Sequence, residues 1–453
     1  MSVACGYVHT VAVTEDGMMY SWGGNIYNKN RVLCVTHTPI PSCIFPFEPF
    51  HHDNCKRITM VAAGKGHSAA LAADGVVWTW GRGDQGALGY GDYLAYPKPT
   101  RLDINAFAET RAVMIACGGF HTMVVTADGR LWTFGRGKDG RLGQGDEEER
   151  LTPTLVLALE VCEAKIVMVA AGVAHSIAAT SDGDVYTWGW GDDGQLGHGD
   201  GDTKIFPTKL DSVYFQGSSA VVVAAGELHS AILTAAGELF VCGNGGHGAL
   251  GLGDTDNRYK PEYLSNDAFS GSLLRMAACG AQHTMAVTEK GELWTWGIGE
   301  FKQLGHGDDI QRRIPTRVDP LYFGGAKIST VAAGTHVSTA LTEQGVLFTW
   351  GVARVSLHAT NKPTGLGHAD LEDKNVPLPM PYHYMQGARV GRFQRLPPDH
   401  ASTFAELLHT STSLVNMLDD NIVRVILDLC IIRPEGVWEG LHGAVSLLGG
   451  VAC

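Results

Sequence analysis

One histidine position recurs along this chain and is the first candidate for chemistry. It holds His9, His67, His121, His175, His229 and His283. Imidazoles bind metals and relay protons, so a ring of them would suit a metal or proton site. Equivalent positions of a repeat lie on separate units, however, where each imidazole more readily bonds nearby backbone or a hydroxyl such as that of Ser176 or Ser230. We therefore interpret these histidines as structural; the seventh position holds Val337, with His336 displaced by one residue.

A recurring aspartate ends a glycine-rich loop in most copies of the pattern. The positions are Asp92, Asp146, Asp200, Asp254, Asp308 and Asp370. A carboxylate in such a turn commonly accepts hydrogen bonds from local backbone amides and so holds the loop in shape. Metal binding is the alternative, because three of these aspartates follow a histidine by two residues: His198, His306 and His368. We favour the structural role, since a reactive group is normally singular.

The ten cysteines show no pattern typical of a metal or redox site. Cys5, Cys117 and Cys279 occupy a position that holds alanine in the other copies, so we expect small core residues. A second group lies in an irregular part of the chain: Cys34, Cys43 and Cys55, near His37, His51 and His52. This group lacks the C-x-x-C and paired-histidine spacings of zinc sites. We predict free thiols, no metal site and no cofactor.

No enzyme signature is found in the chain. A phosphate-binding loop, a nucleophile elbow and a zinc-protease histidine pair are all missing from the sequence. The string GRGDQG at 81–86 resembles a nucleotide loop, but such strings recur and follow a hairpin strand, not a strand that leads into a helix. We therefore assign no catalytic residue.

These residues recur because the chain is a tandem repeat. The first glycine of the unit is found at Gly6, Gly64, Gly118, Gly172, Gly226, Gly280 and Gly334. A second glycine, which closes an aromatic stretch, is found at Gly23, Gly81, Gly135, Gly189, Gly243, Gly297 and Gly351. Both landmarks advance by 58 residues once and then by 54 residues five times. A period of this size indicates a solenoid, a propeller or an array.

Each unit has the pattern of short strands joined by tight turns. In one unit, 166–171 and 175–180 are apolar runs, and 184–188 alternates polar with large apolar side chains. The second and third runs are joined by an Asp-Gly turn, which supplies the positive φ angles of a hairpin. A weaker fourth strand is expected to follow the proline at Pro97, Pro153, Pro207, Pro261 and Pro315. Four strands in each of seven units predict an all-β, seven-bladed β-propeller.

Side-chain size supports this geometry. The residues before the first glycine are alanine or cysteine, as the crowded innermost strand of a blade requires. Aromatic residues stand two apart, so both rings of a pair project to one face of a strand and can fill the wedge between blades. The pairs are Trp78/Trp80, Trp132/Phe134, Tyr186/Trp188, Trp294/Trp296 and Phe348/Trp350. Packing explains these aromatic residues without a ligand.

The repeated motifs resemble a known family. The strings G-x-x-H-[ST], the Asp-Gly hairpin, [WYF]-[TS]-W-G and G-x-L-G-x-G-D are together similar to the regulator of chromosome condensation repeat over residues 1–382. The resemblance implies a seven-bladed propeller. We expect 383–400 to be a linker and 401–453 a short helical segment, because its leucines stand at roughly helical spacing. That segment would be a cap on the propeller, a dimerisation or partner-docking segment, or the start of a further domain.

The resemblance implies three functional directions: guanine-nucleotide exchange on a small GTPase, ultraviolet sensing, and protein interaction in ubiquitin ligases or trafficking proteins. Light sensing is disfavoured because the related sensor places tryptophan just after the repeated glycine, where this chain has residues such as Glu227, Ala281 and Thr335. Exchange factors of this type insert a wedge into the GTPase, which only 352–365 could supply here. We favour a non-catalytic interaction scaffold over exchange activity, with a small GTPase or a ubiquitin-ligase component among the candidate partners.

Charge and hydropathy limit the class of partner and the cellular compartment that we expect for the protein. The net charge of −13 and the lack of a basic arm disfavour direct nucleic-acid binding. No stretch reaches the ~18 to 20 apolar residues of a membrane span. The first residues lack a basic leader followed by an apolar core. We expect a soluble protein of the cytoplasm, the nucleus or both.

Departures from the repeat locate the candidate partner site. Blade one replaces its glycine loop by 25–38, and blade seven has extra residues at 352–365. These blades adjoin in a closed ring and both departures lie between the third and fourth strands, so we expect them side by side on one face. The candidate binding residues are Asn25, Tyr27, Lys29, Arg31, Arg354, His358 and Lys362. Loose ring closure without a binding role is the alternative.

Overall fold

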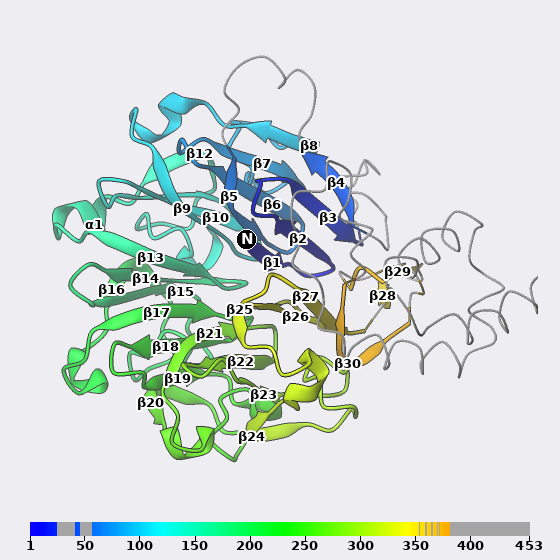
Figure 1. The fold of residues 1–453 in the computed structure, drawn as a ribbon. Coiled ribbons are helices and arrows are strands. Elements are labelled where there is room, and N and C mark those ends of the chain that lie inside the picture. Colours follow the sequence, from blue (N-terminus) through cyan, green and yellow to red (C-terminus); the bar gives the residue numbers. More distant parts are fainter. Residues whose placement is uncertain are drawn as a thin grey trace, which may run out of the picture. The chain divides into compact units, whose positions relative to one another are not determined.

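The computed structural model of the chain describes residues 1–24, 41–45, 57–352, 354–357, 360–363, 366–368, 370 and 372–380. These residues form seven four-stranded antiparallel sheets, arranged as blades around a channel (Figure 1). The predicted all-β, seven-bladed propeller is therefore confirmed. The linker expected at 383–400 and the helical segment expected at 401–453 lie outside the described residues.

Each blade takes its strands from one continuous stretch of chain. Blade one contains β1 (Ser2–Cys5), β2 (His9–Val13), β3 (Met19–Gly23) and β4 (Ser42–Phe45). Blade two contains β5 (Ile58–Ala63), β6 (His67–Ala72), β7 (Val77–Gly81) and β8 (Tyr96–Arg101). Blade three contains β9 (Ala112–Cys117), β10 (His121–Thr126), β11 (Leu131–Gly135) and β12 (Arg150–Leu155). The fourth and fifth contain β13 (Ile166–Ala171), β14 (His175–Thr180), β15 (Val185–Gly189) and β16 (Lys204–Lys209); and β17 (Ala220–Ala225), β18 (His229–Thr234), β19 (Leu239–Gly243) and β20 (Arg258–Leu264). The last two contain β21 (Leu274–Cys279), β22 (His283–Thr288), β23 (Leu293–Gly297) and β24 (Arg312–Arg317); and β25 (Ile328–Ala333), β26 (Val337–Thr342), β27 (Leu347–Gly351) and β30 (Lys374–Pro379).

Short helical turns lie between the strands. The turns between blades are η1 (Ile104–Phe107), α1 (Leu157–Val161), η3 (Ser212–Phe215), η5 (Asn266–Phe269) and η6 (Pro320–Phe323). Two others, η2 (Lys138–Gly140) and η4 (Gly246–Gly248), lie in loops between the third and fourth strands of their blades. None of the helices that the structure describes is long and apolar enough to cross a membrane.

The predicted hairpins form where the sequence places Asp-Gly. Strand β14 pairs with β15 so that His175 faces Gly189 across the ladder. Gly183, in the turn between them, has φ of 87°, a conformation that glycine adopts without strain. The first three strands of each blade are consecutive and antiparallel. The loops after the first and third strands therefore emerge on one face, which we call the loop face.

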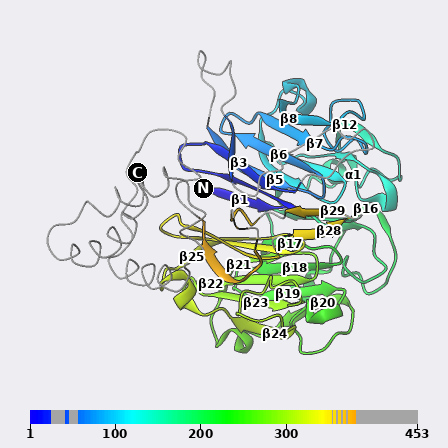
Figure 2. The ribbon, with the colours of Figure 1, turned by 90° about the vertical axis from the view of Figure 1, so that its right-hand side faces the viewer.

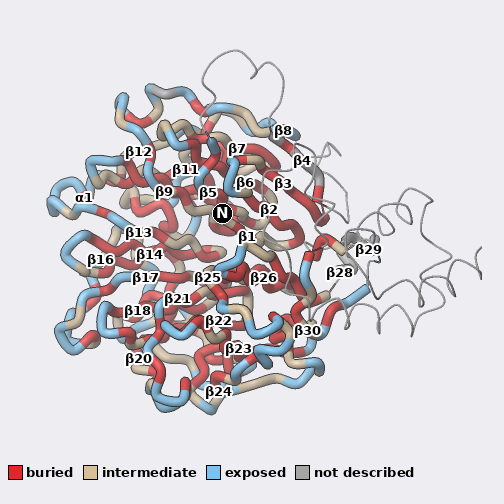
Figure 3. The backbone as a smooth tube through the Cα atoms, in the orientation of Figure 1, coloured by how far each residue is buried: buried red, intermediate tan, exposed pale blue. Residues whose placement is uncertain are grey.

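The fourth strand differs from the prediction. It was expected to follow the proline, but the proline lies inside it, as Pro207 does inside β16. Between β15 and β16 the register shifts between Thr187 and Gly189, next to this proline. An outermost strand bonds a neighbour on one side only, so it tolerates a residue that lacks an N–H, particularly at a bulge. Figure 3 shows the exposed positions along these outer strands and the connecting turns.

The aromatic residues fill the space between blades, as predicted. Trp188 is fully buried and packs against Met123 and Leu131 of the preceding blade. Its indole Nε1 donates to the carbonyl oxygen of Arg141, 2.9 Å away in that blade. Trp296 and Trp350 make the equivalent bonds in later blades. Each of these three indoles therefore joins its blade to the one before.

The inner strands approach so closely that the repeated glycine admits no side chain. A Cβ on Gly172 would lie 2.3 Å from Cε1 of His175 and 2.7 Å from the carbonyl oxygen of Gly226 in the next blade. The same contact with the next glycine carbonyl continues around the axis and ends with Gly334 against the oxygen of Gly6, 2.6 Å from a Cβ. Seven glycines thus form a closed ring of backbone contacts.

The ring closes between blades seven and one by side-chain packing. Strand β1 lies between β5 and β25, as Figures 1 and 2 both show. Val3, Tyr20 and Trp22 of blade one pack with Leu341 and Leu347 of blade seven. The adjacency of these blades, on which the predicted partner site depends, is confirmed.

Replacing Gly172 by alanine tests the closeness of the inner strands. The new methyl group would overlap His175 and the Gly226 carbonyl, so we expect Gly172→Ala to lower the free energy of unfolding by about 1–3 kcal/mol. The matched control is Gly201→Ala, where the nearest atom to a Cβ lies at 3.4 Å. Urea unfolding followed by tryptophan fluorescence measures both. Equal stability of the two variants would contradict the packing argument.

Candidate functional site

The repeated histidines bond hydroxyl groups of the following blade. The distances from Nε2 to the serine or threonine oxygen are His9–Ser68 2.8 Å, His67–Thr122 2.9 Å, His121–Ser176 2.9 Å, His175–Ser230 3.0 Å, His229–Thr284 2.9 Å and His283–Ser338 2.9 Å. Their structural role is confirmed, and hydroxyl partners of the predicted kind are present. The structure adds that each bond crosses from one blade to the next.

The hydroxyl group also determines which ring nitrogen carries the proton. The Ser230 hydroxyl donates to the carbonyl oxygen of Gln195 at 2.8 Å, which uses its one hydrogen. Its oxygen therefore accepts from the Nε2–H of His175. Because Ser230 belongs to blade five while His175 and Gln195 belong to blade four, one hydroxyl joins blade five to both a strand and a loop of its neighbour.

Burial keeps these imidazoles neutral. Removal from water lowers the pKa of His9, His67 and His229 to about 4, and that of His175 and His283 to about 3. The pKa of His121 lies well below its usual value, because of burial first and the charge of Arg141 second. A ring that takes up no proton near neutral pH is a poor acid–base catalyst there.

The histidine network is interrupted at the junction of blades seven and one. Val337 replaces the histidine and is buried. The displaced His336 lies at the mouth of the channel, with its ring centroid 4.2 Å from that of Phe301 and 6.3 Å from that of Tyr7. Burial lowers the pKa of His336 to about 4. Where the other six junctions carry a histidine bond, this one is held by apolar packing and by the contact of Cys5 Sγ with Thr339 Oγ1 at 3.4 Å.

The repeated aspartates hold their loops, as predicted. Oδ1 of Asp200 accepts from the amide of Asp202 at 3.1 Å, and Oδ2 accepts from Nζ of Lys204 at 3.1 Å. The same amide bond is made by Asp92, Asp146, Asp254, Asp308 and Asp370. The histidine that precedes Asp200 is also hydrogen-bonded within the blade, since Nε2 of His198 lies 2.9 Å from Oγ1 of Thr187. Among the described residues, no group of three possible metal ligands gathers.

The inner cysteines line the channel. Cys5, Cys117 and Cys279 lie in innermost strands around a channel of about 90 Å³. The prediction of small residues in a crowded strand is confirmed, with the refinement that they border the channel. Burial raises the pKa of the Cys5 thiol to about 11 and those of Cys117 and Cys279 to about 12. A thiol that stays protonated is a weak nucleophile. Of the second group, only the backbone of Cys43, in β4, is described.

The predicted partner residues are only partly described. Asn25, Tyr27, Lys29, Arg31 and His358 lie outside the described residues. Arg354 and Lys362 fall in β28 (Arg354–Leu357) and β29 (Thr360–Pro363), whose backbones form an antiparallel hairpin. Because this hairpin connects β27 to β30, it leaves the sheet on the loop face (Figure 1). The use of this junction for binding stays a prediction.

The sequence-based prediction missed a group of side chains at the channel mouth, which we call the cation–aromatic row: Tyr7, Lys65, Phe120 and Arg136. Lys65 Nζ lies 5.0 Å from the ring centroid of Tyr7 and 5.5 Å from that of Phe120. Arg136 Cζ lies 5.6 Å from the Phe120 centroid. The signal was present, because these residues fill the positions of G-x-x-H, or the one after the aromatic glycine, that differ from blade to blade.

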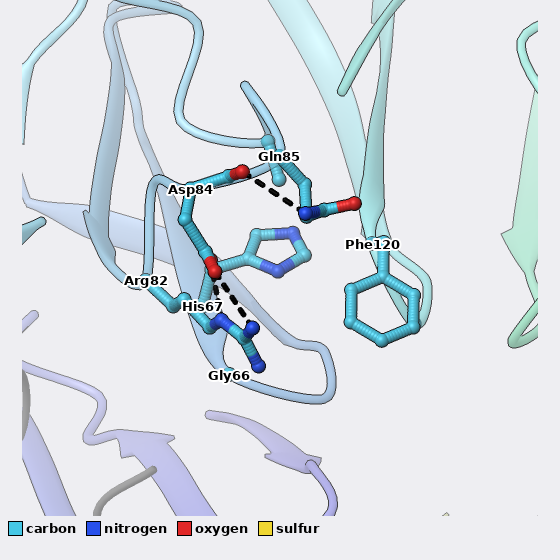
Figure 4. A pocket seen from close by; sticks show the side chains of 8 residues that line it. Gly66, His67, Arg82, Asp84, Gln85 and Phe120 are labelled. Carbon is cyan, nitrogen blue, oxygen red and sulfur yellow. Dashed lines mark hydrogen bonds and ion pairs between the residues drawn. The ribbon is translucent and has the colours of Figure 1, made fainter. Parts of the chain in front are cut away.

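A small hollow lies beside the row, between blades two and three. It holds about 10 Å³, and its lining includes Arg82, Gln85 and Phe120 (Figure 4). The Arg82 guanidinium binds both carboxylate oxygens of Asp84, and the Gln85 amide donates to the Asp84 carbonyl at 3.0 Å. This volume admits about one water molecule, so it is too small for an organic cofactor.

The opposite side of the channel mouth is acidic. Glu227 occupies in blade five the position that Lys65 has in blade two. It is near enough to Tyr7 that, after burial, its negative charge contributes to raising the Tyr7 pKa. Asp192 and Glu300 are exposed in loops of blades four and six on the same face. Acidic side chains therefore lie on the loop face in blades four to six, and Glu147, Glu148 and Glu149 are exposed on the same face in blade three.

Seven four-stranded blades that use their repeated polar side chains internally define the chain as a seven-bladed β-propeller. The RCC1-like domain model matches residues 48–392, and the regulator of chromosome condensation (RCC1) repeat matches residues 2–29. The chain belongs to this RCC1-like family, and the resemblance found in the sequence is confirmed.

Two curated relatives differ widely in overall organisation. The chain is 37% identical over 297 residues to the ultraviolet-B receptor UVR8 of Arabidopsis thaliana, covering 65% of each chain. It is 35% identical over 323 residues to the E3 ubiquitin-protein ligase HERC2 of Homo sapiens, which covers 71% of this chain and 6% of the ligase. The chain thus spans just under two thirds of the receptor and a small part of the ligase.

A solved structure supports the fold. Prp20p from Saccharomyces cerevisiae, studied for its binding to Gsp1p and histones, superposes with a TM-score of 0.62 at 24% identity. The match covers 75% of this chain and 81% of that chain. At this identity the likeness shows the shared propeller alone.

The neutral histidines predict how stability depends on pH. The folded pKa values near 3 to 4 lie below the usual value of 6.5, so the unfolded chain binds more protons between these limits. The histidine contribution to stability is therefore complete above about pH 6.5 and is lost as the pH falls toward 4. Between about pH 4 and 6, His175→Gln should reduce the slope of the unfolding free energy against pH by about 1.4 kcal/mol per pH unit, which corresponds to one proton bound by the unfolded chain. Denaturant unfolding from pH 7 to 4 measures it, and an unchanged slope would contradict a neutral buried His175.

Proposed function

We propose that this propeller is a non-catalytic protein-interaction module that binds partners through its loop face. The observation that carries the proposal is the division between repeated and unrepeated polar residues. The repeated histidines, aspartates and cysteines are bonded or buried within the blades. The side chains that break the repeat, such as Lys65 and Phe120, are half-buried at the channel mouth, where a partner can reach them.

The relatives support this proposal by what they share. A plant receptor and a human ubiquitin ligase both contain a stretch more than 30% identical to this chain. Their names describe different activities, so the propeller itself does not determine the chemistry. In HERC2 the matching stretch is 6% of the length, which is the organisation of a module within a larger assembly. We propose a ubiquitin-ligase component or a small GTPase as the partner, and an ultraviolet-sensing role remains disfavoured by Glu227, Ala281 and Thr335.

The junction of blades seven and one extends the proposed surface. The hairpin of β28 and β29 leaves the loop face where blade seven meets blade one. We propose that it acts together with 25–38, the other departure from the repeat, as a contact region for the partner. A rigid ring that presents irregular loops is the arrangement by which many propellers bind proteins.

Loop replacement tests the proposal. A variant with 25–38 and 352–365 both replaced by the regular loop of blade four, 190–200, should lose capture of its partners by about tenfold, because central interface residues carry most of the binding energy. Immobilised wild-type and variant chains are compared by quantitative mass spectrometry of the bound proteins.

The matched control replaces the loop of blade five, 244–254, by the same blade-four loop, and should keep its partners. Both variants must unfold at the wild-type urea concentration. If the double replacement leaves capture intact, the junction is not the contact region. If neither the wild type nor any variant captures a protein specifically, the interaction module itself is contradicted.

Guanine-nucleotide exchange is the second candidate function. The specific observation in its favour is the β28–β29 hairpin, an insertion in an otherwise regular set of loops and the only one among those the structure describes that could act as a wedge. Prp20p, with the same fold, binds Gsp1p. Exchange would require the hairpin to distort the nucleotide site of a bound GTPase and thereby speed nucleotide release.

A nucleotide-release assay separates the two functions. Any GTPase recovered by capture is loaded with a fluorescent GDP, and its release is followed with and without the purified chain. For an interaction module we expect release rates within about twofold of the spontaneous rate, since binding that leaves the nucleotide pocket unchanged does not shift its affinity. Acceleration that is lost when 353–364 is shortened to Gly-Gly would establish exchange instead.

A further inference from the structure

We infer that the cation–aromatic row binds a short acidic segment of a partner protein, with its carboxylates on Lys65 and Arg136 and an apolar side chain against Phe120. This inference rests on the proposed interaction function and names the chemistry of its partner. It concerns blades one to three at the channel mouth, so it is separate from the hairpin and the 25–38 loop.

The geometry of the row places two positive charges close to one aromatic ring. Lys65 Nζ lies 5.5 Å and Arg136 Cζ 5.6 Å from the Phe120 centroid, and both are within the range of cation–π attraction. Lys65 also lies 5.0 Å from the Tyr7 centroid. Three different blades contribute these residues, so the row crosses two blade junctions and is held by the rigid inner ring.

The two cations are not neutralised within the described part of the chain. Arg82 is paired with Asp84, and Arg150 with Asp146, but no described carboxylate lies within ion-pair distance of Lys65 or Arg136. An aromatic ring attracts a cation without cancelling its charge. Carboxylates of a partner would therefore form charge-assisted hydrogen bonds that the folded chain does not already satisfy.

Charge elsewhere on the molecule favours an acidic protein segment over nucleic acid. The net charge of −13 repels an extended polyanion. Glu227, Asp192 and Glu300 lie on the same face, and a nucleic acid long enough to cross the channel mouth would bring its phosphates against them. A short peptide covers the row alone.

Direct binding tests the inference. The probe is a fluorescein-labelled peptide, DDLEDELDD, titrated with the full chain at low salt and followed by fluorescence anisotropy. We expect saturable binding that weakens as salt rises, since the contacts are between charges at a partly exposed surface. The amide counterpart, NNLQNQLNN, should not bind, because it keeps the leucines and the size but lacks every carboxylate.

Charge reversal locates the site. Lys65→Glu and Arg136→Glu should each weaken peptide binding by about tenfold or more, because each replaces an attraction by a repulsion. Phe120→Ala should weaken it by several-fold through loss of the apolar contact. The matched control is Lys290→Glu, an exposed reversal in the turn between β22 and β23 on the opposite face, which should leave affinity within about twofold. All four variants are checked for wild-type thermal unfolding.

Three results would overturn the inference. The first is no saturable binding of the peptide, and the second is equal peptide affinity of Lys65→Glu, Arg136→Glu and the control Lys290→Glu. The third is tighter binding of a single-stranded oligonucleotide of equal charge that is also weakened by Lys65→Glu and Arg136→Glu. The proposed interaction function fails differently. If capture succeeds and the acidic peptide does not bind, only the acidic-segment inference is lost, whereas failure of both contradicts the interaction module as well.

Discussion

The structure depends on how closely seven inner strands approach one axis. The repeated glycine has no room for a Cβ, because the carbonyl of the next blade lies on one side and the histidine of its own blade on the other, as at Gly172. That closeness brings Nε2 of His175 within 3.0 Å of a hydroxyl on the next blade. Buried polar groups require such partners, so the crowding at the axis also dictates the hydrogen bonding between blades.

This constraint explains how the repeated residues of reactive types are held within the blades. The histidines lose their affinity for protons by burial, the inner thiols keep theirs, and the loop aspartates are occupied by amides and cations. Positions that repeat are used to hold the ring together. Function is therefore sought at positions that differ between blades, because only there can a symmetric scaffold present a unique surface.

The sequence was informative for the fold and partly so for the site. The pattern within the unit placed the first three strands of blade four within one residue of their bounds, since strand and turn chemistry act over a few residues. The fourth strand was placed too late because a proline was taken as its boundary, whereas an edge strand accommodates it. The cation–aromatic row was missed because Tyr7, Lys65 and Phe120 are unremarkable within their own units and come together only across blades.

The sequence by itself determined the number of blades, the order of strands and the structural use of the repeated polar residues, because each follows from contacts inside one 54-residue unit or from its repetition. Only the tertiary structure decided that His175 bonds Ser230, 55 residues away, and that two cations lie close to the Phe120 ring. The physical reason is that these contacts join residues of different blades. Their distances depend on how the side chains pack across each junction, which the pattern within one unit does not record.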